Sequence, residues 1–367
     1  MRVKQITGLA VAYATYATAL ALPQDIEFDL VDATPDPPTP VISIGATAQV
    51  ITYNAPSLIA EVVSDVLEGG AVVPEDVVTK RAQGDCAVQP TGLGENSSPD
   101  TADAFLADPK YNGIADIATT PAGYTRTFSK FQASNNAFGY MGYDTLQSYD
   151  TVECAKRCTN KRGCNAFNIY FERDPTLDPG PTCSDPASTI NIKCVFWGGP
   201  VTPQNAVNTG ETRNAFRVVI SGSNGYVSEA LNTPAGYGAS VYLGDAAINA
   251  PLDDCGVNTY MGVKLFNQGQ FDIALCASAC TAQSEYNLRH PPKEGKAKTC
   301  QYFNTYILYK NDVAQGQYCS LYSESWDRSY AVNRGQYRGS DKYTISYSFS
   351  VSNATNPNPP PTSCPAL

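Results

Sequence analysis

Apolar side chains recur at every second position in two stretches of the chain, as is typical of a β-strand with one face toward a core. In the first stretch, Phe167, Ile169 and Phe171 form the apolar face, and the stretch 303–307 alternates in the same way. Both stretches are therefore predicted as strands. Further strands are predicted at 194–197, 216–220 and 343–347.

Two pairs of cysteines are spaced four residues apart, which in a helix places both members of a pair on one face. The pairs are Cys154 with Cys158 and Cys276 with Cys280, and an aspartate precedes each pair by four residues. Each pair predicts a helix. Another short amphipathic helix is predicted from Ser57 to Leu67.

Several short stretches of the sequence occur twice, in the same order. This internal repeat predicts that the chain contains two homologous copies of one unit. The matched stretches are 120–124 with 233–237, 140–142 with 260–262, the two cysteine pairs, 164–170 with 300–306, 194–197 with 319–322, and 206–208 with 331–333. The spacing of the matches predicts a longer loop at 281–299 in the second copy and at 174–193 in the first.

The order of a Cys-x-x-x-Cys helix and two cysteine-led strands resembles the PAN/apple domain. More narrowly, it is similar to the paired apple-like domains of secreted fungal proteins sometimes labelled carbohydrate-binding-like. The resemblance covers 120–351 and implies an α+β fold of two tandem domains, 120–232 and 233–352. In each, a disulfide-pinned helix lies on a curled antiparallel sheet.

The resemblance also implies the disulfides. Two nested pairs are expected in each copy, and some apple domains add a bridge between their ends. The implied pairs are Cys154–Cys194 around Cys158–Cys164, Cys276–Cys319 around Cys280–Cys300, and an end-to-end Cys255–Cys364. Cys86 and Cys183 remain and could pair with each other, although sequence alone cannot fix connectivity.

The ends of the chain differ from its middle. Residues 1–21, with a basic start, an apolar run and a cleavage site after Ala21, predict a secretory signal peptide rather than a membrane anchor. The cysteine-free segment 22–81 ends in a dibasic pair, which predicts a pro-segment cut after Arg81; an uncleaved linker is the alternative. Residues 82–119 are predicted as a linker or N-terminal extension, and 353–367 as a proline-rich tail.

Composition indicates an exported protein. The twelve cysteines are read as a disulfide framework, because oxidising compartments let disulfides persist. Asn96 and Asn353 fit the glycosylation sequon. The formal net charge of −10 argues against nucleic acid, whose phosphates would repel the surface. A single histidine and the lack of paired Cys-x-x-Cys motifs argue against zinc, and no metal or cofactor is predicted.

Catalytic signals are weak. A nucleophile–histidine site could use only His290, which lies in the loop private to the second copy. A glycosidase needs two carboxylates, and the candidates are Glu172 with Asp174, and Asp253 with Asp254. Neither pair has a counterpart in the other copy, so we expect no enzyme activity.

A binding function is expected instead, because tyrosine and tryptophan join a rigid apolar ring to a polar group. The candidate ligand face consists of recurring residues on the strand side away from the phenylalanines and on a neighbouring strand: Asn168, Tyr170, Trp197, Asn304, Tyr306 and Tyr322. Packing is the alternative role for these residues.

Two classes of function remain open. The first is a secreted binding or adhesion protein that recognises extracellular polysaccharide or glycoprotein in a cell wall or matrix, without nucleic acid or membrane as a partner. The second is a protein-interaction or structural wall protein, or an effector, without a sugar site. A glycoside hydrolase is the third and weakest alternative.

Overall fold

The computed structural model describes residues 26–355 and Cys364, apart from 39, 41, 43–44, 46, 52 and 69–83. The predicted signal peptide, the predicted cleavage site at Arg81 and the proline-rich run 356–362 lie outside the described residues. The described chain is a mixed helix and sheet structure that is mostly β.

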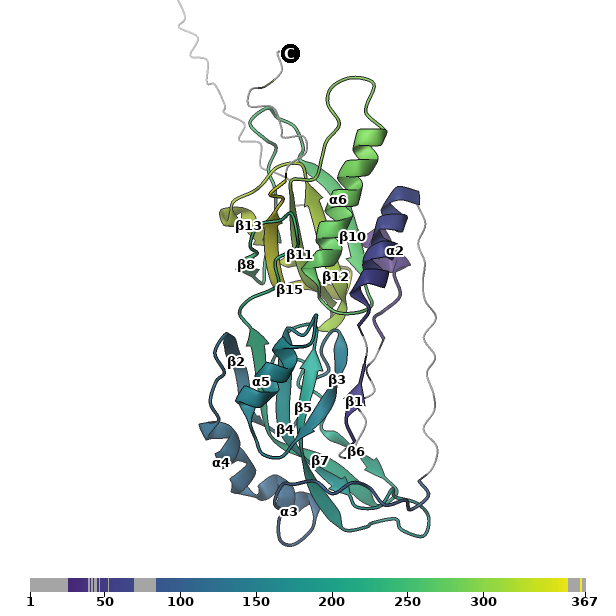
Figure 1. The fold of residues 1–367 in the computed structure, drawn as a ribbon, viewed down its shortest axis with the longest axis vertical. Helices are drawn as coiled ribbons and strands as arrows, with labels where there is room; N and C mark the ends of the chain where they lie inside the picture. The colour runs from purple at the N-terminus through teal and green to yellow at the C-terminus, as the bar shows by residue number, and fades with distance from the viewer. Residues whose placement is uncertain are drawn as a thin grey trace, which may run out of the picture.

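Helices and strands follow one another along the chain in two similar series (Figure 1). The helices are α1 (Phe28–Ala33), α2 (Ala55–Glu68), α3 (Ala102–Ala107), α4 (Pro109–Ile117), α5 (Thr151–Thr159), α6 (Ile273–Arg289) and the 3-10 helix η1 (Arg328–Tyr330). The first strands are β1 (Gln49–Val50), β2 (Tyr124–Phe131), β3 (Tyr140–Leu146), β4 (Ala166–Pro175), β5 (Ser188–Trp197), β6 (Gly210–Arg213) and β7 (Phe216–Ser228). The later strands are β8 (Val241–Gly244), β9 (Ala247–Ile248), β10 (Tyr260–Phe266), β11 (Tyr302–Lys310), β12 (Val313–Tyr322), β13 (Ala331–Asn333), β14 (Gly335–Arg338) and β15 (Asp341–Ser352).

Two antiparallel sheets share one strand order. The sheet of the N-terminal half (residues 84–230) runs β3-β5-β4-β7-β2, and that of the C-terminal half (residues 231–355) runs β10-β12-β11-β15-β8. The short strands β6 and β14 pair with the first residues of β7 and β15. The repeat in the sequence is therefore matched by a repeat in strand pairing.

A bulge recurs at the same place in both sheets. The register of β4 with β7 shifts between Ile169 and Phe171, and that of β11 with β15 shifts between Thr305 and Ile307. Gly222 of β7 and Tyr347 of β15 adopt left-handed backbone there, with φ of 59° and 56°. Glycine tolerates this conformation, whereas a bulky residue adopts it only when its surroundings hold it. Tyr347 is held by the rings of Phe271 and Phe349.

Each sheet carries one disulfide-pinned helix. Asp150 and Asp272, the aspartates that precede the cysteine pairs, are the N-caps of α5 and α6 and accept backbone N–H bonds from Glu153 and Ala274. The apolar strand faces pack under these helices with the helix cysteines, so the predicted apolar faces are confirmed as core.

All six predicted disulfides are present. They are Cys154–Cys194, Cys158–Cys164, Cys276–Cys319, Cys280–Cys300, Cys255–Cys364 and Cys86–Cys183. Each closes a loop of the chain and is expected to stabilise the fold by about 2–4 kcal/mol.

The N-terminal segment (residues 26–68) lies along both halves (Figure 1). Its strand β1 pairs with β3, and α2 packs against α6 through Val62, Leu275 and Ala279. Its helix α1 covers the outer face of the C-terminal sheet, where Val31 is buried. The predicted helix at 57–67 is confirmed as part of α2.

Three predicted connections are more structured than expected. Helix α6 continues to Arg289, so the insertion 281–299 begins as two further helical turns. In the N-terminal half, β4 extends to Pro175 and β5 begins at Ser188, which shortens the expected loop 174–193. In the segment 84–119, α3 and α4 contribute Phe105 and Tyr111 to the core.

Candidate functional site

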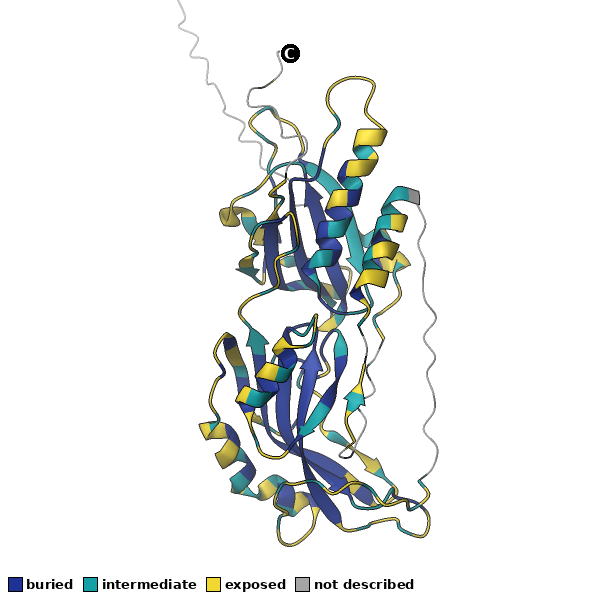
Figure 2. Cartoon of the chain, viewed as in Figure 1, coloured by how far each residue is buried: buried dark blue, intermediate teal, exposed yellow. Residues whose placement is uncertain are grey.

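The six residues of the predicted ligand face are buried, which corrects the expectation that they form an exposed surface. Asn168, Tyr170, Trp197, Asn304, Tyr306 and Tyr322 are each at most 2% exposed. Figure 2 shows the central strands of both sheets buried along their length. A ring without an exposed face cannot stack on a ligand, so packing, the alternative role, accounts for these residues.

Asn168 and Asn304 hydrogen-bond neighbouring segments of the chain to the central strands of the sheets. The amide oxygen of Asn168 accepts the backbone N–H of Asn135 at 3.2 Å, and its Nδ2 donates to the carbonyl of Asn224 at 2.9 Å. The amide oxygen of Asn304 accepts the N–H of Ile248 at 2.9 Å, and its Nδ2 donates to the carbonyl of Phe349 at 2.8 Å. The two residues therefore recur because they make the same bonds.

The recurring aromatic residues are covered by other parts of the chain. Tyr306 stacks on Tyr318 with ring centroids 5.0 Å apart, and the Tyr318 hydroxyl accepts the backbone N–H of Glu27, just before α1. Trp197 packs on Tyr140 at 5.2 Å. The face predicted for a ligand is thus occupied by the protein itself.

The residues predicted as catalytic candidates are buried or take part in local structure. Glu172 and Asp174 are buried and cannot reach a substrate. Asp253 accepts backbone N–H bonds from Cys255 and Val257 within a turn. His290 is the exposed C-cap residue of α6, and its ring packs on Tyr286 at 4.3 Å.

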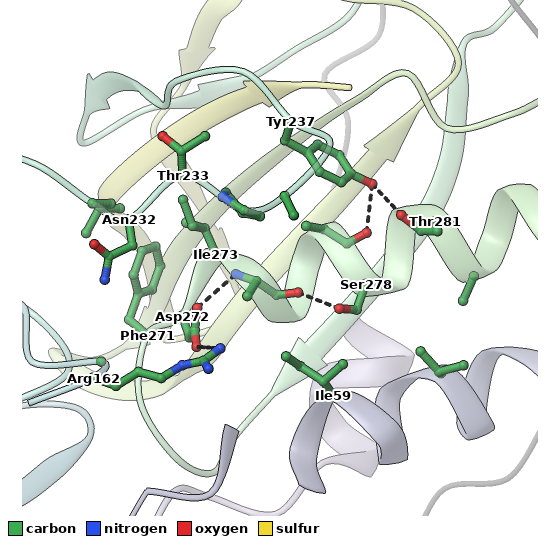
Figure 3. A pocket seen from close by; sticks show the side chains of 18 of the residues that line it. Ile59, Arg162, Asn232, Thr233, Tyr237, Phe271, Asp272, Ile273, Ser278 and Thr281 are labelled. Atoms are coloured by element: carbon green, nitrogen blue, oxygen red, sulfur yellow. Dashed lines mark hydrogen bonds and ion pairs between the residues drawn. The ribbon is translucent and has the colours of Figure 1, made fainter. Parts of the chain in front are cut away.

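A pocket of about 610 Å³ lies beside the first turns of α6 (Figure 3). Several of its polar groups already bond within the protein. Asp272 accepts a hydrogen bond from the Tyr53 hydroxyl at 3.1 Å and faces Arg162, while the Tyr237 hydroxyl donates to the carbonyl of Ala277 at 2.7 Å. Burial and the negative charge of Asp272 raise the pKa of Tyr53. The remaining wall is largely apolar, so this pocket offers few directional contacts to a polar ligand.

A second hollow, the inter-sheet cleft, has about 800 Å³ and is walled by both halves. The N-terminal half contributes the ends of β2 and β7 and the loop 200–205, and the C-terminal half contributes β8, β15 and residues near the ends of β11 and β14. Its exposed polar and charged residues are Thr125, Gln204, Glu229, Asp245, Asp312, Arg334 and Lys342.

Tyr242 of β8 is the exposed aromatic residue among those that line the inter-sheet cleft. It is 54% exposed, and its ring lies 5.1 Å from that of Phe349 and 6.4 Å from that of Tyr347. These contacts pack part of the ring against β15 while the rest of the side chain remains exposed. Two carboxylates in the cleft are also fixed: Asp245 accepts a hydrogen bond from Ser346 at 3.0 Å, and Glu229 accepts one from Thr125 at 2.8 Å.

Sequence reasoning did not find Tyr242. The residue lies outside the repeated stretches, and its neighbours in Val241–Gly244 carry no motif. A cleft made by two halves is a product of their packing, so no local pattern marks its lining residues.

The chain matches no model of a known protein family, no curated protein and no solved structure. Among the described residues, no helix has the length and apolar character needed to cross a membrane. The same residues contain no cluster of three or more histidine, cysteine or acidic side chains suited to a metal ion.

Proposed function

We propose that this protein is an extracellular, non-catalytic binding protein that recognises carbohydrate in the inter-sheet cleft. The observation that carries the proposal is Tyr242, a half-exposed ring held in place within a hollow lined by hydroxyl, amide, carboxylate and cationic groups. Ligand sites combine such concavity with a few directional polar groups.

This combination suits a sugar. A pyranose ring has an apolar C–H face that packs on an aromatic ring, and hydroxyl groups at its edge that need donors and acceptors. Tyr242 offers the ring, and the carboxylates of Asp245 and Glu229 are oriented by Ser346 and Thr125. Groups that are already oriented lose little conformational entropy when they bind.

The extracellular location is part of the proposal and is supported by the six disulfides, which persist in oxidising compartments. We also propose that the two halves are tandem apple-like domains derived from one another. The shared strand order, the paired bulges and the equivalent N-caps of α5 and α6 support this relation.

The test is retention on polysaccharide. Secreted wild-type protein is applied to insoluble chitin, glucan and cellulose and to a glycan array, together with Tyr242→Ala. We expect the variant to lose about tenfold in affinity for the retained glycan, which corresponds to about 1.4 kcal/mol. Tyr286→Ala is the matched control, because Tyr286 is also partly exposed but lies on α6 outside the cleft.

Other outcomes separate the alternatives. No retention on any glycan would reject the sugar site and favour a protein-interaction or structural role. Equal losses in both tyrosine variants would reject the inter-sheet cleft as the site. Release of reducing sugar from the retained glycan would show a hydrolase instead of a binding protein.

A further inference from the structure

Lys193 of β5 and Glu172 of β4 form an ion pair inside the N-terminal sheet. The Lys193 side chain is 0% exposed and that of Glu172 is 4% exposed, and the Nζ of Lys193 contacts Oε1 of Glu172. In the strand register Lys193 lies opposite Tyr170, and Glu172 lies two positions further along β4, opposite Asn191. The two side chains therefore meet diagonally across neighbouring strands.

Asp174 completes the cluster on the same face of β4. It is fully buried and accepts a hydrogen bond from Nδ2 of Asn191 at 2.6 Å. Burial, followed by the negative charge of Asp174, raises the pKa of Glu172 to about 8. The raised pKa favours the neutral carboxylic acid of Glu172 over its carboxylate.

The surroundings of the cluster are aromatic. The Nζ of Lys193 lies 4.3 Å from the ring centre of Tyr143, and both Tyr143 and Tyr170 are buried. Keeping two charges in such a place costs free energy, because the interior solvates them less well than water does. A reaction that removes both charges is favoured by the same surroundings that make the ion pair costly.

We propose that Lys193 and Glu172 condense to form an amide cross-link between β5 and β4. A proton first moves from the Lys193 ammonium to the carboxyl pair, which leaves a neutral amine beside a neutral carboxylic acid. The Nζ lone pair attacks Cδ of Glu172 and forms the C–N bond. One carboxyl oxygen then leaves as water, taking one proton from nitrogen and one from the carboxyl group.

The condensation balances without an oxidant or a co-reactant: an ammonium and a carboxylate become an amide and one water molecule. In bulk water this equilibrium favours the separate ions, because they are well hydrated and water is abundant. Neither condition holds in the buried cluster. Asp174 acts as the acid–base group that holds and returns the proton.

The C-terminal half serves as an internal control. Aligning Cys164 with Cys300 and Cys194 with Cys319 places Leu308 at the position of Glu172 and Tyr318 at that of Lys193. That half has no amine and carboxyl pair at these positions. A cross-link is therefore expected in one half only.

Peptide mapping tests the proposal on the wild-type secreted protein. After reduction, alkylation and removal of glycans, trypsin should fail to cut after Lys193. It should release residues 163–173 joined to 174–213 as one branched species, lighter by one water than the sum of its parts. Full recovery of separate peptides 163–173 and 174–193 would overturn the proposal without any variant.

Two variants sharpen the test. Lys193→Arg keeps the positive charge but lacks the amine, so no branched peptide should form. Asp174→Asn should lower the linked fraction at least tenfold at a fixed time after secretion, with the disulfide map unchanged. An undiminished linked fraction in Asp174→Asn would overturn the role assigned to Asp174, and a branched peptide in Lys193→Arg would reject Lys193 as the donor.

Discussion

Each sheet has an outer face, on the side away from its disulfide-pinned helix, and the two outer faces bury different kinds of side chain. In the N-terminal half, β4 and β5 bury Lys193 with Glu172, whereas the equivalent strands of the C-terminal half bury the stacked rings of Tyr306 and Tyr318. Both faces are covered by other parts of the chain, in the C-terminal half by α1. The comparison teaches that one strand order and one disulfide pattern accommodate a polar or an apolar interior, provided that the face is covered.

The largest expected loss of stability comes from removing the buried cation of Lys193. Lys193→Met leaves Glu172 and Asp174 buried without their cation, which should lower the free energy of unfolding by about 3–5 kcal/mol. Urea denaturation measures the loss. The double variant Lys193→Met/Glu172→Leu, which places leucine where the other half has Leu308, should recover the part that comes from the unpaired charge. No recovery in the double variant would show that charge burial is not the cause.

The asparagine pair tests the features that the halves share. Asn168→Ala and Asn304→Ala each remove one acceptor and two donors that bond to buried groups. Each should lower the free energy of unfolding by about 1–3 kcal/mol, and by similar amounts. Chemical denaturation of the two variants side by side is the measurement. A clear difference between them would mean that equal bonding does not give equal stability in the two halves.

A smaller and more local effect is expected where the helices differ. Helix α2 covers α6 through Val62, which is 6% exposed, while α5 has no such partner helix in the described chain. Val62→Asp places a charge in this contact and should detach α2. Hydrogen exchange should then quicken in α6 and remain unchanged in α5. Equal exchange in α6 of variant and wild type would show that α2 does not protect it.

The smallest expected effect is the loss of stability at acidic pH when Asp100 becomes protonated. Burial alone would raise the pKa of Asp100, but hydrogen bonds from Ser188 and Arg173 outweigh it and lower the pKa below its usual value. Stability from this group is present above the unfolded-state pKa of about 3.9 and is lost as pH falls through the lower folded-state value. Because Asp100 is partly exposed, we expect less than about 1 kcal/mol. Acid titration of unfolding should be flatter in Asp100→Asn, and an identical pH profile would contradict this.

The repeated framework could be predicted from the sequence because its signals are local. Cysteine spacing marked the helices, alternation marked the central strands, and resemblance supplied the disulfide pairs, all of which are present. The helix at 57–67 followed from its apolar stripe.

The ligand face could not be predicted in the same way. Tyr170 and Glu172 alternate with phenylalanines and so look like a solvent-facing row, yet loops and strands from elsewhere in the chain bury that row. Tyr306 is covered by α1, although α1 (Phe28–Ala33) lies in the N-terminal segment, far from Tyr306 in the sequence. Such cover is decided by tertiary packing, and Tyr242 became a candidate only when two halves enclosed it.

The shared walls of the inter-sheet cleft have a mechanical consequence. A ligand that contacts Tyr242 and Asp245 on one side and Glu229 on the other bridges the two halves. It would add to the contacts that they already make through the linker near residue 231, through the N-terminal segment and through the hydrogen bond from Asn165 to the carbonyl of Phe271. A ligand bound in the inter-sheet cleft would add a contact between the halves and would therefore resist hinge motion between them. A bound polymer would then stiffen the molecule along its long axis, and a pull on the polymer would be shared by both sheets.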